Sequence, residues 1–595
     1  MGYLPIEEHG IIGDLQTAAL VGVDGTIDWL CLPRFDAPSV FASVLDDEKG
    51  GHFGLSPLDY MRSQQLYLPD TNVLLTRFLS PDGVAEVLDF MPIEKETGER
   101  HGLIRGVRVI RGRMHFEVEC RPAFDYARQK HVISLGKTGA VFAGADMRLG
   151  LATEVPLREG PARSAIGRFA LGEGESATFV LQERRMGEGP GDVLSEARFQ
   201  EKLQQTLDYW RRWISGGTYR GRWREMVNRS ALVLKLMVYD PTGALVAAPT
   251  MGLPETIGGE RNWDYRYTWP RDAAFTIYAL SRLGFHEEAH NFMGWIQDIC
   301  RNSGGSLQPL YGIDGRTRIH EEELFHLSGY RGSRPVRLGN GAYDQLQLDL
   351  YGAVLDAAYL HNKHGVPLDY DVWRHLRPIL DWLSENWRQL DEGIWEVRGG
   401  RRPFVSSRVL SWVALDRAIR MARQRGLPAP EDRWIKQRDA IYEEIMEKGW
   451  NPERESFVQY YGGEALDASL LLMPLVKFVG PTDPRWLATL DRIQEELAYD
   501  TLVFRYKVDE AADDGFSSEE GSFSICSFWL VECLARAGRL EEARLSLEKM
   551  FSYANHLGLF AEEIGPSGEA LGNFPQAFTH LSLISAAVNL DQALG

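Results

Sequence analysis

The chain has 595 residues, more than one hydrophobic core usually organises, so two or more domains are expected. Its 65 Lys and Arg against 84 Asp and Glu give a net charge of −19, which argues against a nucleic-acid partner, because phosphate backbones are bound by clustered cations. Five scattered cysteines lack metal-ligand spacing, no run approaches the roughly 18 apolar residues of a membrane span, and no secretion signal is visible. We therefore predict a cytoplasmic protein with no membrane contact and no structural zinc.

The first third of the chain reads as short β-strands separated by turns. Alternating, β-branched runs such as Val73 to Leu79 and Ser176 to Glu183 are bounded by turn residues such as Asp82-Gly83. This spacing predicts an antiparallel β-sandwich, supersandwich-like, over residues 1–195. A helical stretch then ends at Gly216-Gly217, so residues 196–222 are predicted to be a helical linker.

From residue 223 to 595 the apolar period changes to 3.6 residues, and twelve helices are expected. Their approximate ranges are 225–239, 272–283, 286–302, 341–363, 368–388, 404–425, 431–448, 466–478, 484–498, 520–537, 540–554 and 575–593. The connections alternate between long and short. If successive helices are antiparallel, all the long connections emerge at one end, which predicts an all-α (α/α)6 barrel with one rim of functional loops.

The first long connection carries Arg261-Asn-Trp-Asp-Tyr-Arg-Tyr-Thr-Trp-Pro-Arg-Asp272. A guanidinium that only donates, at Arg271, beside a carboxylate that only accepts, at Asp272, can together hold vicinal hydroxyl groups. The aromatic residues of this segment could wall a sugar site; they are Trp263, Tyr265, Tyr267 and Trp269. The alternative is that Asp272 caps the next helix and the aromatic residues pack in the core.

Two further connections carry charged clusters. Arg331, Arg334 and Arg337 could bind sugar hydroxyls or an anion, and they could equally clamp nearby carboxylates. Later in the chain Arg505 could bind substrate, whereas the adjacent pair Glu519-Glu520 is expected to cap the following helix.

Two glutamates stand out as an acid and base pair. Glu396 lies between apolar neighbours, an environment that raises a carboxyl pKa as a proton donor requires, although Asp391 and Glu392 compete for that role. Glu562 follows an apolar run and precedes a Gly/Pro turn, which would turn it into the cavity and turn Glu563 outward. Two carboxylates on opposite sides of one cavity are what glycoside hydrolysis needs.

At these connections the sequence resembles the glucoamylase family, glycoside hydrolase family 15, over nearly its whole length. The resemblance rests on Gly393-Ile-Trp-Glu396, on Ala561-Glu-Glu-Ile564 and on the 265–272 segment, with Glu8 to Asp14 and Asp24 to Leu30 resembling the β-domain of prokaryotic members. It implies Glu396 as general acid and Glu562 as general base. The residues that it implies in the sugar site are Tyr265, Trp269, Arg271, Asp272, Trp395 and Arg505.

The resemblance implies an inverting, exo-acting α-glucosidase that releases β-glucose from small α-glucosides, without metal or organic cofactor. In fungal members a second glutamate follows the acid, whereas Val397 stands here, which puts the subsites beyond the first glucose in doubt. The alternative is an α,α-trehalase on the same scaffold. More remote are a non-catalytic carbohydrate-binding protein and a disaccharide phosphorylase. The chain could also form a homo-oligomer.

Overall fold

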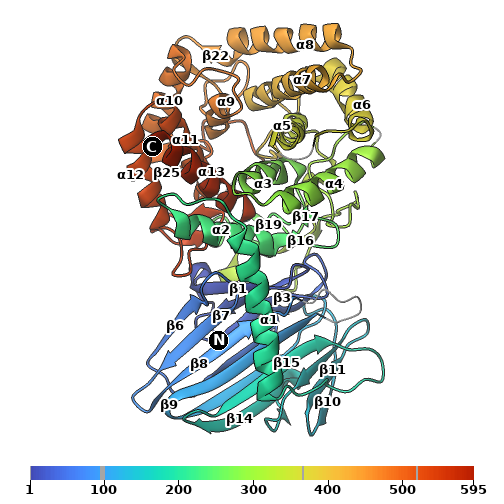
Figure 1. Ribbon diagram of the computed structural model, residues 1–595, viewed down its shortest axis with the longest axis vertical. Coiled ribbons are helices and arrows are strands. Elements are labelled where there is room, and N and C mark those ends of the chain that lie inside the picture. The colour runs from blue at the N-terminus through green and yellow to red at the C-terminus, as the bar shows by residue number, and fades with distance from the viewer. Residues whose placement is uncertain (1, 94–100, 304, 365–366, 517–519) are drawn as a thin grey trace.

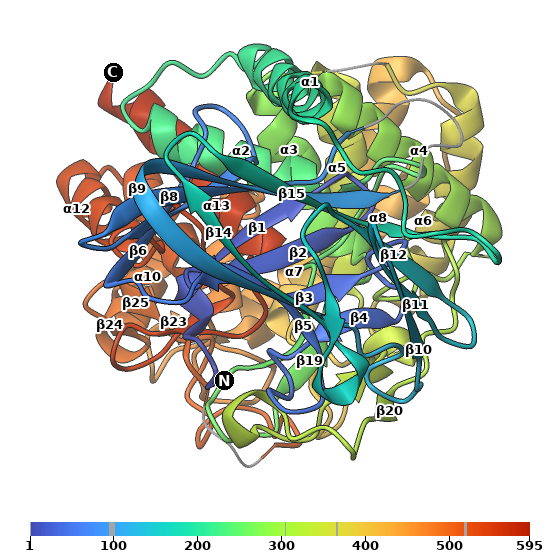
Figure 2. The same cartoon turned by 90° about the horizontal axis from the view of Figure 1, so that it is seen from below.

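A computed structural model describes residues 2–93, 101–303, 305–364, 367–516 and 520–595. It contains a β-sandwich built from the first third of the chain and a larger helical body built from the rest (Figure 1). Figure 2 shows the strands of the sandwich crossing one end of the helical body. No helix within these described ranges is both long and apolar enough to cross a membrane.

The sandwich is antiparallel throughout, as predicted. Its strands are β1 (His9–Gly13), β2 (Ala18–Gly22), β3 (Thr26–Cys31), β4 (Ser39–Ala42), β5 (His52–Pro57), β6 (Arg62–Tyr67), β7 (Leu74–Leu79), β8 (Gly83–Phe90), β9 (Gly102–Arg121), β10 (Val132–Gly136), β11 (Gly139–Ala143), β12 (Arg148–Ala152), β13 (Arg158–Glu159), β14 (Ala165–Gly172) and β15 (Ser176–Glu183). In β7 every second residue is buried, the alternation expected of a strand with one face on the core.

The long strand β9 belongs to both layers of the sandwich. Its first half pairs with β8 and β15, and its second half pairs with β5 and β14. One continuous strand therefore ties the two layers together. Contacts with the helical body include those from β3, through Trp29, and from the turn between β6 and β7, through Asn72.

Helix α1 (Glu196–Ser215) leads from the sandwich to the helical body and lies along the sandwich in Figure 1. Ser195 caps it by accepting a hydrogen bond from the Arg198 backbone N–H. This helix agrees with the predicted linker, while the domain limits 1–195, 196–222 and 223–595 stay a prediction.

In the described part of the helical body there are twelve helices, as expected. They are α2 (Arg224–Met237), α3 (Pro270–Arg282), α4 (His286–Asn302), α5 (Asp349–His364), α6 (Tyr370–Asn386), α7 (Val405–Arg425), α8 (Glu431–Glu444), α9 (Leu472–Leu475), α10 (Pro484–Glu496), α11 (Ser524–Arg536), α12 (Leu540–Phe551) and α13 (Ala577–Leu594). A π-turn at Ile445–Gly449 extends α8, and a 3-10 turn at Ala468–Leu471 precedes α9.

Every second helix belongs to an inner ring. α3 packs on α5, α5 on α7, α7 on α9, α9 on α11, α11 on α13, and α13 again on α3, which closes the ring. Helices α7, α11 and α13 are buried on nearly every side, whereas the outer helix α4 buries one stripe that includes Phe292, Trp295 and Ile299. The prediction of a sandwich followed by an (α/α)6 barrel is confirmed.

The long connections lead from an outer to an inner helix and all reach the same end of the barrel. They hold short antiparallel pairs: β16 (Val238–Tyr239) with β17 (Ala244–Leu245), β18 (Met251–Pro254) with β19 (Asn262–Asp264), β20 (Glu322–Glu323) with β21 (Arg337–Leu338), β22 (Trp450–Asn451) with β23 (Ser456–Phe457), β24 (Ala498–Tyr499) with β25 (Leu502–Val503), and β26 (Ser522–Phe523), β27 (Glu563–Ile564) and β28 (Ala570–Leu571) as a three-stranded group. The first turns of the inner helices therefore face these connections, and the positive ends of the helix dipoles face the same way.

Candidate active site

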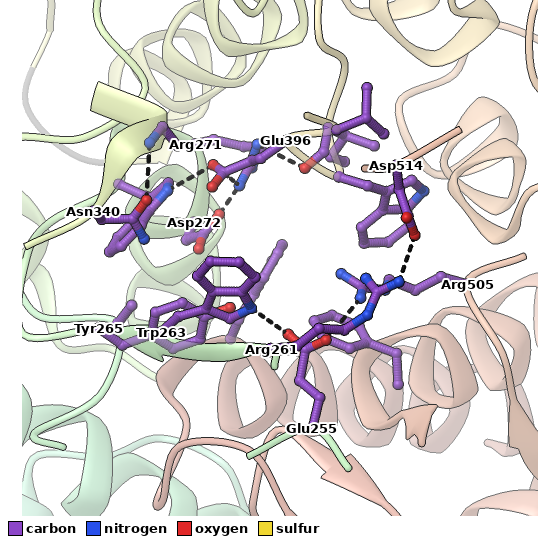
Figure 3. Close-up of a pocket in the computed structure, with 18 of the residues that line it drawn as sticks. Glu255, Arg261, Trp263, Tyr265, Arg271, Asp272, Asn340, Glu396, Arg505 and Asp514 are labelled. Atoms are coloured by element: carbon purple, nitrogen blue, oxygen red, sulfur yellow. Dashed lines mark hydrogen bonds and ion pairs between the residues drawn. The ribbon is translucent and has the colours of Figure 1, made fainter. Parts of the chain in front are cut away.

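A pocket opens among the long connections at the first turns of the inner helices. It contains about 790 Å³ of space between atoms, open solvent included. Five of the connections line it, as do Phe523 and Phe578 at the starts of α11 and α13. Figure 3 shows Glu396 and Arg271 on one side of this hollow and Glu255 on the opposite side.

Glu396 lines the pocket from the α6–α7 connection, in a left-handed backbone conformation with φ of 59°. The Trp269 indole N–H donates to Glu396 Oε1 over 2.7 Å, and an Arg271 guanidinium nitrogen lies 3.5 Å from the same oxygen. The side chain is 20% exposed, so the carboxyl group is held in place yet reaches the pocket. The predicted role of Glu396 as proton donor stays a prediction.

Arg271 and Asp272 lie beside Glu396, in the first turn of α3. Arg271 donates to Asp272 Oδ1 over 2.9 Å, to the Gln347 side chain and to the Ile394 carbonyl. Burial raises the pKa of Asp272 to about 6, and neighbouring Arg271 opposes that rise. The helix begins at Pro270 and its N-cap is Trp269, so the predicted N-cap role of Asp272 is wrong. Asp272 lies in the first turn instead, where the positive end of the helix dipole stabilises a carboxylate.

Glu562 is fully buried just before β27, and it does not line the pocket surface directly. The Tyr265 hydroxyl donates to its Oε1 over 2.6 Å, and the Asn573 backbone N–H donates to its Oε2 over 3.3 Å. Burial and the nearby Glu255 carboxylate together raise its pKa to about 8, against the opposing hydrogen bond from Tyr265. Gly572 packs its backbone against the same carboxylate, with φ of 72°.

Two aromatic residues connect these carboxyl groups. Tyr265 and Trp269 both line the pocket, and their rings meet edge to face with centroids 5.4 Å apart. Since Tyr265 holds Glu562 and Trp269 holds Glu396, a single aromatic pair fixes the two carboxyl groups relative to each other. Glu396 thus lies at the pocket surface and Glu562 lies beneath Tyr265, while their roles as acid and base stay a prediction.

Arg505 lines the pocket with its guanidinium among three buried carboxylates. Its Nε donates to Glu520 Oε1 over 2.9 Å and its Nη2 pairs with Glu255 over 3.2 Å, while Glu563 lies 3.9 Å away. Within the described ranges these glutamates are the one group whose oxygens are close enough to share a metal ion, and Arg505 already supplies a positive charge there. The expectation that Glu563 turns outward is wrong, because it is fully buried.

The prediction that the pair Glu519-Glu520 caps the next helix is wrong for Glu520. Glu520 pairs with Arg505 and Arg261 instead of capping α11, whose N-cap is Phe523. Glu519 lies outside the described residues. A glutamate that the sequence placed at a helix start, Glu520, is therefore part of a buried ion-pair network.

The outer wall of the pocket consists of an aromatic pair flanked by arginines. Trp263 and Phe516 meet edge to face at 5.3 Å, and the Arg398 guanidinium lies over both rings. Arg398 pairs with Glu321 through two contacts, at 3.0 and 2.7 Å. Its backbone N–H donates to the Asp514 carbonyl, which ties the α6–α7 connection to the α10–α11 connection across the mouth.

The remaining predicted residues divide into lining and structural ones. Trp395 lines the pocket and donates its indole N–H to Asp467 at 2.9 Å. Tyr267 is buried away from the pocket, so it is not a wall residue. Among the residues that compete for the acid role, Asp391 is fully buried and accepts from Ser407, whereas Glu392 pairs with Arg401.

The arginine-rich connection is a clamp in this structure. Arg337 contacts Glu321 and the Glu260 carbonyl, Arg334 donates to the Ser328 carbonyl, and none of the three arginines lines the pocket. The sequence motifs did not predict a pocket role for several other lining residues, which are Glu255, Asn340, Arg398, Asp514, Phe516, Phe523, Gln576 and Phe578. Glu255 could have been noticed six residues before Arg261, in Leu253-Pro-Glu255.

Comparison with known proteins shows the family and the fold of the chain. Residues 221–588 match glycosyl hydrolases family 15, and residues 2–154 match the trehalase-like N-terminal family. A trehalase of Thermoplasma volcanium is 40% identical over all of this chain and 94% of its own length, and a trehalase of Mycobacterium tuberculosis is 41% identical over 99% and 90%. A bacterial glucoamylase complexed with acarbose shares the fold, with a TM-score of 0.72 at 12% identity over 99% of this chain and 94% of its own.

Proposed function

The chain belongs to glycosyl hydrolases family 15, and from that membership we propose that it is an inverting α,α-trehalase, with Glu396 as general acid and Glu562 as general base. An O-glycosyl hydrolase acting on a sugar substrate follows from the family; the linkage and the residue roles are the proposal. The observation that supports the roles is the Trp269–Tyr265 pair, because Trp269 binds Glu396 at the pocket surface and Tyr265, which lines the same pocket, binds the buried Glu562.

The choice of trehalose over a general α-glucoside rests on two points. Relatives that match nearly the whole chain at 40–41% identity bear the name trehalase, and the N-terminal match is trehalase-like. In addition Arg398, Trp263 and Phe516 line the pocket together, next to the connection that carries Glu396, and we propose that this wall limits the site to two sugar rings. The α-glucosidase that the sequence favoured thus gives way to its alternative.

In the proposed reaction the inner glucose lies against Trp269 and Trp395. The adjacent donor and acceptor, Arg271 and Asp272, hold its outer hydroxyls. Arg505 faces the same ring, and because Glu255 and Glu520 fix its guanidinium, its orientation does not have to be set when substrate binds.

Bond cleavage then needs two proton transfers. Glu396 gives its proton to the oxygen between the two glucose units as the bond from C1 breaks. A water molecule attacks C1 from the opposite face and gives its proton to Glu562, which must be ionised at that moment. Tyr265 stabilises that ionised form through its hydroxyl group, because its hydrogen bond is donated to a charged oxygen.

Product analysis tests the proposal directly. The purified protein would be given trehalose, maltose, maltotriose, isomaltose and dextran, and the anomers released in the first minutes would be followed by proton NMR. We expect trehalose to be the preferred substrate and to yield α- and β-glucose in equal amounts, because inversion occurs at only one of its two anomeric carbons. Preference for maltose with β-glucose as the first product would restore the α-glucosidase reading, and glucose 1-phosphate formed only with phosphate would indicate a phosphorylase.

A further inference from the structure

Residues of the segment from Trp263 to Arg266 face the pocket and the β-sandwich in alternation. Trp263 and Tyr265 line the pocket, as successive outward residues of an extended segment should. Asp264 and Arg266, which point the other way, are fully buried. The substrate-binding segment therefore has a second face, and that face contacts the β-sandwich.

Arg266 is the centre of this second face. It binds Asp264 through two hydrogen bonds of 2.8 and 2.7 Å, and its Nη1 donates to the Ala37 carbonyl of the sandwich over 2.9 Å. The same nitrogen lies 3.4 Å from the sulfur of Cys31, at the end of β3. The rings of Trp29 and Tyr126, also from the sandwich, lie 5.8 and 5.4 Å from its guanidinium.

A second contact from the sandwich reaches the other side of Tyr265. The Trp29 indole N–H donates to the Pro249 carbonyl over 2.7 Å. Pro249 lies between Ala248 and Thr250, whose backbone groups pair with the carbonyl and the N–H of Tyr265. The backbone of Tyr265 is therefore held both through its neighbour Arg266 and through the segment 248–250 beside it.

The same segment, residues 248–250, also reaches Glu562 by a separate route. The Thr250 hydroxyl donates to the Asn573 side chain over 2.9 Å, and the Asn573 backbone N–H donates to the Glu562 carboxylate. The Asn573 amide also donates to the Trp263 carbonyl over 3.0 Å. Both oxygens of the Glu562 carboxyl group thus depend on groups anchored at the sandwich.

We propose that the β-sandwich is a positioning element of the active site, in which Arg266 and Trp29 fix Tyr265 and, through Tyr265, the orientation of the Glu562 carboxyl group. This inference rests on the proposed role of Glu562 as general base. Arg266 is a positioning residue, because it reaches the reacting atoms only through Tyr265.

Arg105 offers a matched control within the sandwich. It is also fully buried, binds Asp89 through two hydrogen bonds of 2.7 and 3.1 Å, and donates to the carbonyls of Phe53 and Gly25. It differs from Arg266 in having no contact with the pocket segment. Arg105→Lys therefore removes the same kind of forked contact and reports the general cost of doing so.

The experiment is a double-mutant cycle with trehalose as substrate. We expect Arg266→Lys to lower kcat at least tenfold and to move the acidic limb of kcat/KM to higher pH, while Arg105→Lys leaves both within twofold at a similar loss of Tm. In a Tyr265→Phe background, Arg266→Lys should lower kcat by less than threefold, because the route through the hydroxyl is already gone. Equal effects in both backgrounds, or an unmoved pH limb, would overturn the inference.

Two further variants keep the test decisive. If Arg266→Lys does not fold, as judged by circular dichroism, Trp29→Phe replaces it; the limb should again move to higher pH, and an unmoved limb would reject the proposal. Glu562→Gln separates the inference from the proposed function. Normal turnover in Glu562→Gln removes the base itself, whereas an inactive Glu562→Gln with an additive cycle rejects only the role of the sandwich.

Discussion

Removal of the Tyr265 hydroxyl is the perturbation whose size follows most directly from the structure. This hydroxyl donates the shorter of the two hydrogen bonds to Glu562, at 2.6 Å against 3.3 Å for the Asn573 N–H. A hydrogen bond to a charged group is worth about 1.5–3 kcal/mol, and one pKa unit corresponds to about 1.4 kcal/mol. Because the bond stabilises the ionised carboxylate, Tyr265→Phe should raise the pKa of Glu562 by roughly 1–2 units.

The pKa of Glu562 in the native protein determines how much activity this shift removes. With the pKa at about 8, roughly a tenth of Glu562 is ionised at pH 7 in the free enzyme. A rise of roughly 1–2 units lowers the ionised fraction, and with it kcat/KM at pH 7, by about 10–100-fold. The loss should shrink as the pH approaches 9, since a larger share of Glu562 then becomes ionised.

The assay is the pH dependence of kcat/KM for trehalose between pH 5 and 10. Tyr267→Phe is the matched control, because it removes a buried hydroxyl from the same segment outside the pocket. We expect its profile to coincide with that of the native protein. A uniform loss in Tyr265→Phe at every pH would show that Tyr265 only packs the pocket, and the reasoning about Glu562 would be wrong.

Three other predictions concern the same site. Glu396→Gln and Glu562→Gln should each lower kcat by about 10²–10⁴-fold in a glucose-release assay, and near-normal turnover in either would remove that residue from the mechanism. Glu255→Gln should move the acidic limb of kcat/KM to lower pH, because the Glu255 charge raises the pKa of Glu562; a limb that moves upward would contradict this. Gly572→Ala should lower Tm and kcat together, because its left-handed φ of 72° costs a side chain about 1–2 kcal/mol and the added methyl group meets the Glu562 carboxylate; an unchanged Tm would refute the strain.

Protonation of Glu562 should also affect stability. Its pKa is raised by folding, so ionisation costs free energy in the folded state, and this cost appears as pH rises from the unfolded value towards 8. The Tm of Glu562→Gln relative to the native protein should therefore be higher at pH 8.5 than at pH 5, as measured by differential scanning calorimetry. The opposite trend would mean that Glu562 is ionised in the folded protein well below pH 8.

The sequence predicts the architecture well because periodicity and connection length are local properties. Strand alternation and the 3.6-residue repeat separate the two domains, and the long connections alone indicate which end of the barrel holds the site. The apolar neighbours of Glu396 left Asp391 and Glu392 as competitors, and the family resemblance singled out Glu396, whose carboxyl group the structure places at the pocket.

Burial by distant segments could not be predicted in the same way. Nothing beside Glu563 in the sequence indicates that Arg505 and Glu255 lie against it, so it was expected to face solvent. Arg398 and Asp514 are likewise far apart in the chain, and only the folded connections bring them together over the pocket. The sequence shows Arg266 only as a charged residue within an aromatic motif, and its contact with the Ala37 carbonyl of the sandwich becomes evident only in the folded structure.

The short turns at the other end of the barrel offer a practical opportunity. One of them begins at Gly426, which has the left-handed conformation that ends α7 and has nothing near the position of a missing side chain. A tether to a solid support or a fused reporter introduced in residues 426–430 would leave the sugar-facing loops directed away from the attachment. An immobilised form of the enzyme can therefore be designed without altering any residue discussed for the reaction.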